Sequence, residues 1–386
     1  MAAPTPIPPE NLLDGQDFLQ EIKDRPDALV YFLCNVGDGD AQLLLLPQAA
    51  GAGGRQAVVV DCAVTGKIPP LLASLAGQGI VVADGAGAEP IALVVATHPH
   101  QDHMGGMPEL LAQFGPQIAE FWDPGYYHVL AAYHQTMAAI EALPQLLYAQ
   151  PASGLRRWIG DVAITVLSPS VSLKNRFDSY GTEINDSSIS LRIEFPVHRL
   201  LESRANVEEG GVIEHPSTCA LVLGADAQTL SWSYVLVDFP LLFKSGTPAA
   251  KAIGAAQADT DALAADVLKV SHHGSKHGVN LELVERIAPK LTLVSSVGGG
   301  GEFFFPHTVT QEVIREGLDP SAGHPHPHPE DYKLGVFYAA DTDGQRALGS
   351  IALVMSPDRC TMWRFGDAPL DAINLTAVRK WAQDVW

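Results

Sequence analysis

The chain has 386 residues, of which 47% are hydrophobic and 18% charged, and this balance excludes a disordered or fibrous protein. Its 24 lysines and arginines against 44 aspartates and glutamates give a net charge of −20, and the basic residues form no long run. Unassisted binding to long nucleic acid needs basic residues that displace counterions, so the composition disfavours that function unless metal ions or a basic partner subunit change the local charge.

The cysteines and the apolar segments indicate the compartment. The four cysteines form no CxxC pair and lie in or beside apolar stretches, which is typical of buried free thiols in a reducing compartment. We recognise neither a signal peptide nor an uninterrupted apolar run of about 18 residues. We therefore expect a soluble, cytoplasmic protein that does not enter a membrane.

In the first half of the chain, local patterns predict strands that alternate with helices. Residues 1–27 are rich in proline and charge and are expected to form a surface lead-in to a body that begins near Ala28. Two apolar runs between Leu29 and Leu46 flank the turn Gly37-Asp38-Gly39-Asp40 and predict a hairpin. Periodicity then predicts a strand at 56–62, a helix at 68–77, a strand at 91–96, a helix at 133–148 interrupted at Pro144, and strands at 162–167 and 187–195.

The second half continues the alternation around two polar segments. We expect a surface insertion near 199–217 and an extended His/Pro loop at 320–329. The predicted elements are strands at 219–223 and 266–270, a helix at 280–287, a strand at 291–297, a helix at 309–316, strands at 351–355 and 361–365, and an amphipathic C-terminal helix at 375–386. No long linker divides them, so residues 28–386 are expected to form one α/β domain.

The strongest chemical signal follows the strand predicted at 91–96. His98, His100, Asp102 and His103 stand within six residues. Imidazole nitrogens and carboxylate oxygens suit zinc or manganese, and alternate residues leaving a strand can point into one cavity. The pattern therefore predicts a loop that provides two ligands to each of two metal ions, and the alternative is a polar surface loop.

This loop, Thr97 to Gly106, with its intact His-x-His-x-Asp-His core, resembles the signature of the metallo-β-lactamase superfamily. Further blocks in the same order resemble the soluble hydrolase domain of ComEC-type DNA-uptake proteins: 32–41, 58–61, 185–188, 223–226, 268–275 and 298–307. The resemblance implies an αββα sandwich of two packed mixed β-sheets with helices on the outer faces.

The resemblance also implies the remaining metal ligands. Asp226 would bridge both ions, and one histidine of the pair His272/His273 would complete the shell of the second ion. We favour His272, because it follows the strand first, and expect His273 to contact the substrate as a catalytic residue or to lie in an outer shell.

A further histidine that many members of the superfamily place before the bridging carboxylate has no clear counterpart. The four histidines in that interval lack supporting context: His128, His134, His198 and His215. Asn185 and Asp186 occupy roughly that place instead. Asp186 is a candidate metal ligand and Asn185 a candidate hydrogen-bond donor to substrate, while a simple strand cap is an equal alternative.

Two ions about 3.5 to 4 Å apart provide a bridging hydroxide at neutral pH, so the chain is expected to be a hydrolase that needs no separate nucleophilic side chain. Asp102 would orient the nucleophile or accept its proton, and Lys276 and His307 would contact an anionic substrate. A phosphodiesterase or nuclease that acts on a nucleic acid or a nucleotide-like molecule is favoured. The alternatives are a hydrolase of a carboxylic ester, lactone or amide, and a non-catalytic regulatory or binding protein. A protein partner or a homo-oligomer is compatible with the acidic surface.

Overall fold

The protein is described here by a computed structural model. It describes residues 18–82, 89–177, 182–196, 218–240, 262–296, 303–319, 331, 334–340, 342–343, 346–376 and 381–386. The insertion expected near 199–217, the His/Pro loop expected at 320–329 and the glycine run at 298–301 lie outside these residues.

The described strands form two large sheets and one short ribbon. The first sheet contains, in spatial order, β18 (Trp381–Asp384), β17 (Arg359–Arg364), β16 (Ile351–Ser356), β1 (Leu29–Leu33), β2 (Ala41–Leu45), β3 (Ala57–Cys62), β4 (Ile91–Val95), β5 (Glu120–Trp122) and β6 (Leu147–Ala149). The second contains β13 (Val336–Tyr338), β12 (Leu291–Val294), β11 (Val267–Lys269), β10 (Cys219–Leu223), β9 (Ser190–Phe195), β8 (Val162–Ser168) and β7 (Arg156–Ile159). The ribbon pairs β14 (Thr342–Asp343) with β15 (Arg346–Ala347).

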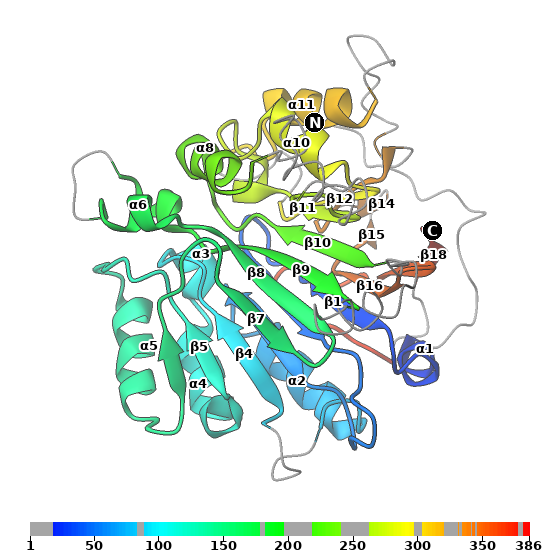
Figure 1. The fold of residues 1–386 in the computed structure, drawn as a ribbon. Helices are drawn as coiled ribbons and strands as arrows, with labels where there is room; N and C mark the ends of the chain where they lie inside the picture. Colours follow the sequence, from blue (N-terminus) through cyan, green and yellow to red (C-terminus); the bar gives the residue numbers. More distant parts are fainter. Residues whose placement is uncertain are drawn as a thin grey trace, which may run out of the picture.

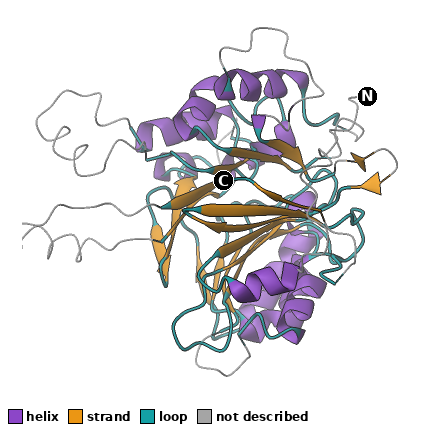
Figure 2. Ribbon diagram, turned by 90° about the vertical axis from the view of Figure 1, so that its right-hand side faces the viewer, coloured by secondary structure: helices purple, strands orange, loops and turns teal. Residues whose placement is uncertain are grey.

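Helices cover the outer face of each sheet, so the molecule has four layers (Figures 1 and 2). Beside the first sheet lie α1 (Phe18–Asp24), α2 (Ile68–Gly77), α4 (Met107–Phe114) and α5 (Ala131–Glu141). Beside the second lie α8 (Thr229–Asp238), α10 (Leu281–Ile287) and α11 (Thr308–Leu318). The expected α/β sandwich of two mixed sheets is confirmed.

The alternation of side chains along a β-strand explains how one apolar run packs against two layers of the molecule. In β1, Val30 and Phe32 pack with the helices of the first sheet, whereas Leu29, Tyr31 and Leu33 pack with the second sheet. Successive side chains of a strand point to opposite faces, and both faces of this strand are covered. The strand is therefore apolar at every position, as the sequence indicated.

The described end of the expected N-terminal lead-in contains a helix that attaches to the core. Helix α1 lies within the stretch 1–27 that was expected to be a surface segment, and Phe18 is fully buried. The ring of Phe18 packs edge-on against Phe32, Trp363 and Phe365. The charged residues around this short helix concealed the few apolar side chains that attach it to the core.

The predicted C-terminal helix is wrong. Residues Trp381–Asp384 form β18, which pairs antiparallel with β17 in the register Thr361↔Asp384. Backbone bonds from Cys360 N to Trp386 O and from Val385 N to Cys360 O extend the pairing. Without β18, strand β17 would expose a row of unpaired backbone groups at the edge of the sheet. A further strand satisfies these hydrogen bonds, and this tertiary contribution overrides the local amphipathic pattern that predicted a helix.

The predicted helix at 133–148 is also shorter than expected. Helix α5 ends at Glu141, and Leu147–Ala149 forms β6, which runs parallel to β5. Pro144 lacks a backbone N–H and cannot continue a helix, so the chain turns there and rejoins the sheet. Across the described residues, no helix combines the length and apolarity needed to cross a bilayer.

Candidate metal centre

Loops that leave the carboxyl ends of β4, β10 and β11 meet at one place. Residues 97–103 follow β4, Asp226 follows β10, and His272 and His273 follow β11. Strand β4 belongs to the first sheet and the other two belong to the second. The packing of the two sheets therefore brings together side chains that are far apart in the sequence, at the type of strand end where α/β proteins gather functional groups.

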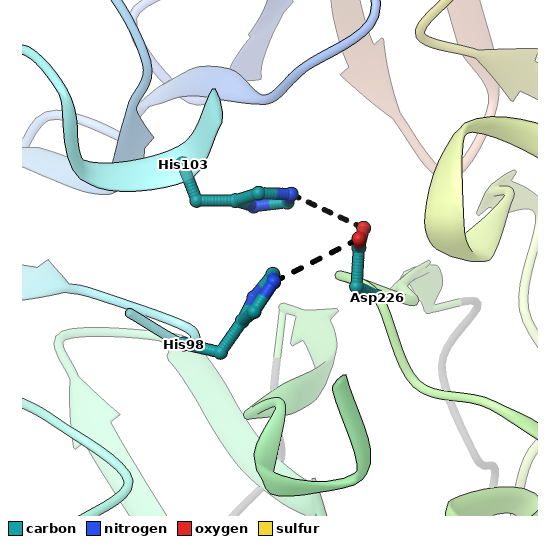
Figure 3. A group of neighbouring side chains, drawn as sticks. All are labelled: His98, His103 and Asp226. Atoms are coloured by element: carbon teal, nitrogen blue, oxygen red, sulfur yellow. Dashed lines mark ion pairs between the residues drawn. The ribbon is translucent and has the colours of Figure 1, made fainter. Parts of the chain in front are cut away.

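The buried carboxylate of Asp226 lies among four histidines. Its Oδ1 is 3.2 Å from His103 Nε2 and 3.4 Å from His273 Nε2. Its Oδ2 is 3.7 Å from His98 Nε2 and 3.7 Å from His272 Nε2. Figure 3 shows His98 and His103 approaching different oxygens of this carboxylate. Each oxygen therefore faces its own pair of imidazoles.

The remaining two residues of the signature loop divide between these two sides. His100 Nδ1 is 3.1 Å from His98 Nε2. Asp102 Oδ2 is 3.5 Å from His273 Nε2, and ligand atoms of Asp102, His103 and His273 lie within 4.8 Å of one another. The structure thus places His273 with Asp102 and His103, on the Oδ1 side of the Asp226 carboxylate.

The ligand atoms of this cluster fit a divalent cation. Among the described residues, His103 Nε2, His273 Nε2 and Asp226 Oδ1 are buried without a hydrogen-bond partner. A buried polar atom left unpaired costs about 1–3 kcal/mol, so three that converge indicate a missing positive partner. Imidazole nitrogen and carboxylate oxygen are the donors that zinc and manganese accept.

The charges of the cluster are consistent with this use. Burial raises the pKa of Asp226, but His103, His273 and His272 outweigh it and hold the pKa well below its usual range. Burial lowers the pKa of His103, but Asp226 and Asp61 outweigh it and raise the pKa well above its usual range. Because metal ligands must be deprotonated, an ion that binds His103 Nε2 displaces its proton.

Asp61 is a functional residue that the sequence analysis missed. Its Oδ2 is 2.8 Å from His103 Nδ1, and it also accepts hydrogen bonds from the backbone N–H and the hydroxyl of Thr97, at 2.8 Å each. A carboxylate on the far nitrogen of a ligand histidine fixes the tautomer and the orientation of the ring. The available signal was a charged residue inside the otherwise apolar strand β3.

A second buried carboxylate supports the other histidine. Nδ1 of His273 lies 3.0 Å from both the carbonyl and the hydroxyl oxygen of Ser295. The Ser295 hydroxyl donates to Asp40 Oδ1 at 2.6 Å, and Lys269 donates to the other oxygen of Asp40. The sequence analysis treated Asp40 only as a turn residue, although it connects the first hairpin to the metal centre.

An unusual backbone brings both histidines of the pair to Asp226. His272 and His273 have φ values of 50° and 51°, in the left-handed region. Neighbouring side chains of an extended strand point to opposite sides, so only one of the two would reach the carboxylate without this turn. The conformation costs roughly 1–2 kcal/mol per residue, and a hydrogen bond from His272 N to Ala225 O helps to hold it.

Gly274 provides a test of how closely this loop must be placed. A Cβ added at Gly274, which has φ +84°, would lie 2.5 Å from Pro306 Cβ, whereas at Gly154, with φ +87°, no described atom lies within 4 Å. Both alanine substitutions incur a left-handed backbone cost of about 1 kcal/mol, but only Gly274→Ala adds a clash beside His273. We expect Gly274→Ala to lower zinc affinity and stability more than Gly154→Ala, as measured by chelator competition and urea unfolding. Equal zinc affinities would show that the loop tolerates displacement.

The other predicted site residues have different surroundings. Asp186 closes a capping box with Glu183 and accepts a hydrogen bond from the Ser231 hydroxyl, so it acts as a helix cap. Asn185 is buried next to it in the 3-10 helix Ile184–Ser187. His307 lies close to residues 271–276, which carry His272 and His273 and are called the histidine loop. Its Nδ1 accepts a hydrogen bond from Lys276 N at 2.9 Å.

Comparison with known proteins agrees with this geometry. Residues 50–179 match the sequence profile of the metallo-beta-lactamase superfamily. No curated protein matches the chain in sequence.

Several solved structures resemble the chain at low identity. The metallo-beta-lactamase fold protein YhfI from Bacillus subtilis is 15% identical, with 70% of this chain and 86% of that one covered and a TM-score of 0.33. A diphosphatase from the PhnP family is 12% identical (85% and 98% covered, TM-score 0.37), and a long form of RNase Z from yeast is 11% identical (71% and 37% covered, TM-score 0.36). The likeness to the superfamily rests on this match of residues 50–179, and the four-layer architecture of the two mixed sheets is consistent with it.

Proposed function

We propose that the protein is a hydrolase that depends on two divalent metal ions, zinc in preference to manganese, and that its substrate is a phosphodiester. The observation that carries the proposal is the Asp226 carboxylate, whose two oxygens face separate groups of ligand residues. When bound, two such ions supply an activated water and stabilise the charge that develops on the leaving oxygen.

The burial of the ligands indicates the side from which a substrate would approach. The side chains of His98, His103 and Asp226 are at most 2% exposed, whereas that of Asp102 is 43% exposed. Burial raises the pKa of Asp102, but His273 and His103 outweigh it and hold the pKa below its usual range. A carboxylate that stays ionised at the open side is suited to hold a cation and to orient a nucleophile by accepting its hydrogen bond.

The resemblance of the chain to ComEC-type hydrolase domains supports a phosphodiester substrate, and the charge of the chain bears on the size of that substrate. The net charge of −20 disfavours long nucleic acid, so we favour a nucleotide-like molecule or a short strand. Lys276 is exposed and His307 is partly exposed beside the histidine loop, and we propose that they contact the phosphate. Asn185 remains a candidate for hydrogen bonding to substrate.

One observation supports a second candidate, the hydrolysis of a carboxylic ester, lactone or amide. Phe303 and Phe304 are 58% and 69% exposed, and the ring of Phe305 lies 5.4 Å from that of His272. This apolar rim would receive an acyl group as well as a nucleobase. The metal ligands themselves suit either reaction, because both use the same activated water.

Metal analysis combined with a substrate panel tests the proposal. The purified protein is expected to contain close to two zinc or manganese ions per chain and to hydrolyse bis(p-nitrophenyl) phosphate, with loss on chelation and recovery on adding metal. His100→Ala should be nearly inactive, and His134→Ala, which alters an exposed histidine on α5, should retain activity. Activity on lactones or esters alone would favour the second candidate, and full occupancy without turnover on any substrate would favour a binding role.

A further inference from the structure

Without His272, the two oxygens of Asp226 are surrounded by different numbers of candidate ligand residues. The side of Asp226 Oδ1 has three further ligand residues in Asp102, His103 and His273. The side of Asp226 Oδ2 has only His98 and His100 from the signature loop. Three protein ligands are enough for a catalytic zinc ion, and a further donor on the Oδ2 side would give that side as many ligands as the Oδ1 side.

We propose that His272 is this donor, so that the adjacent histidines His272 and His273 bind different ions. The inference rests on the proposed two-metal centre and assigns ligands within it. Nε2 of His272 and Nε2 of His98 are each 3.7 Å from the same oxygen, Asp226 Oδ2. Nε2 of His273 instead lies 3.4 Å from Oδ1. Ligands that share an ion at bond lengths near 2 Å stand about 3–4 Å apart, and each of these three histidine–Asp226 distances lies in that range.

The surroundings of His272 support a role as ligand. Its Nδ1 lies 3.3 Å from the side-chain amide nitrogen of Gln228, and its side chain is 17% exposed. Rotation of this amide exchanges its nitrogen and oxygen, so that the oxygen accepts Nδ1–H when Nε2 binds an ion. Gln228 would then orient His272 as Asp61 orients His103.

Two other residues compete for the same position. His128 lies on the loop after β5, with its ring centroid 6.2 Å from that of His100, and its Nδ1 accepts a hydrogen bond from Leu130 N. Asp186, the candidate from the sequence, already binds Ser231 and the backbone N–H of Glu183. Among the described contacts, neither residue approaches Asp226 Oδ2, whereas His272 Nε2 lies 3.7 Å from it.

Counting metal ions in single and double variants tests the assignment. Asparagine replaces histidine in each, because it tolerates left-handed backbone and is too short to reach the ion. The free zinc concentration is kept just high enough to fill both sites of the unsubstituted protein. Under this condition we expect His272→Asn to retain about one ion per chain by mass spectrometry, and His128→Asn to retain two. Adding His100→Asn to His272→Asn should cost no further ion, whereas adding His103→Asn should remove the remaining one.

The alternative outcomes overturn the inference separately from the proposed function. If His272 served the ion on the Oδ1 side, the combination with His103→Asn would retain an ion and the combination with His100→Asn would lose both. Two ions in His272→Asn, or one ion in His128→Asn, would also overturn it while leaving the two-metal hydrolase intact. A wild-type protein that binds no metal would refute the proposed function itself. Should His272→Asn fail to fold, His272→Gly with added imidazole serves instead, and recovery of the ion on the Oδ2 side is the expected result.

Discussion

Asp226→Asn is expected to lower the metal content from close to two ions per chain to less than one and to abolish hydrolysis. The substitution preserves the shape of the side chain but replaces one carboxylate oxygen with an amide nitrogen, which cannot bind a cation. Because each oxygen of Asp226 faces a different ligand group, both ions lose a negatively charged donor. Loss of metal-based stabilisation of the transition state amounts to several kcal/mol, or about 10³-fold in kcat/KM.

A matched control for this variant is Asp266→Asn. Asp266 precedes β11, at the opposite end of the strand from the histidine pair, and its carboxylate accepts a hydrogen bond from Ala220 N. It is an aspartate of the same sheet without a contact to the metal ligands in the described part of the chain. We expect it to retain both ions by mass spectrometry. Full metal content in Asp226→Asn would contradict the assignment of this carboxylate as the bridge.

Lys269→Met is expected to destabilise the protein by about 3–5 kcal/mol. Lys269 and Asp40 form an ion pair whose side chains are both fully buried. Methionine fills a similar volume but leaves the carboxylate of Asp40 buried without its charged partner, and an uncompensated buried charge is costly. Urea unfolding of the chelated protein measures this effect without a contribution from metal binding.

The comparison variant is Lys290→Met, which breaks the ion pair with Asp266. The side chain of Lys290 is 53% exposed, and exposed pairs contribute at most about 1 kcal/mol. The double variant Lys269→Met with Asp40→Leu removes both buried charges and should recover part of the lost stability. Equal stabilities of the two lysine variants would contradict the view that Asp40 depends on Lys269.

Local sequence signals were sufficient to predict most strands and the candidate ligands of the signature loop. The run Ile91–Val95 is apolar at every position because both faces of β4 are covered, and this can be recognised without knowing what covers them. The spacing of His98 and His103 predicted metal ligands, because the candidate donors of the signature loop stand close together in the sequence. Asp226 could be found through the resemblance, as the polar residue at the end of an apolar strand.

Long-range contacts decided the features that the sequence analysis missed or assigned differently. The strand Trp381–Asp384 forms because β17 offers a sheet edge, and no local pattern reveals that edge. Asp40 and Asp61 support His273 and His103 across large sequence separations, so their roles exist only after the sheets pack.

The sequence by itself determined the layered α/β architecture and the chemical type of the centre, because apolar period and ligand chemistry are properties of short segments. The tertiary structure decided how these side chains are grouped around Asp226. His272 and His273 are equivalent in sequence, and only a left-handed turn beside Ala225 directs them to different oxygens of one carboxylate. Backbone conformation of that kind is imposed by the packing around the loop and has no local signature.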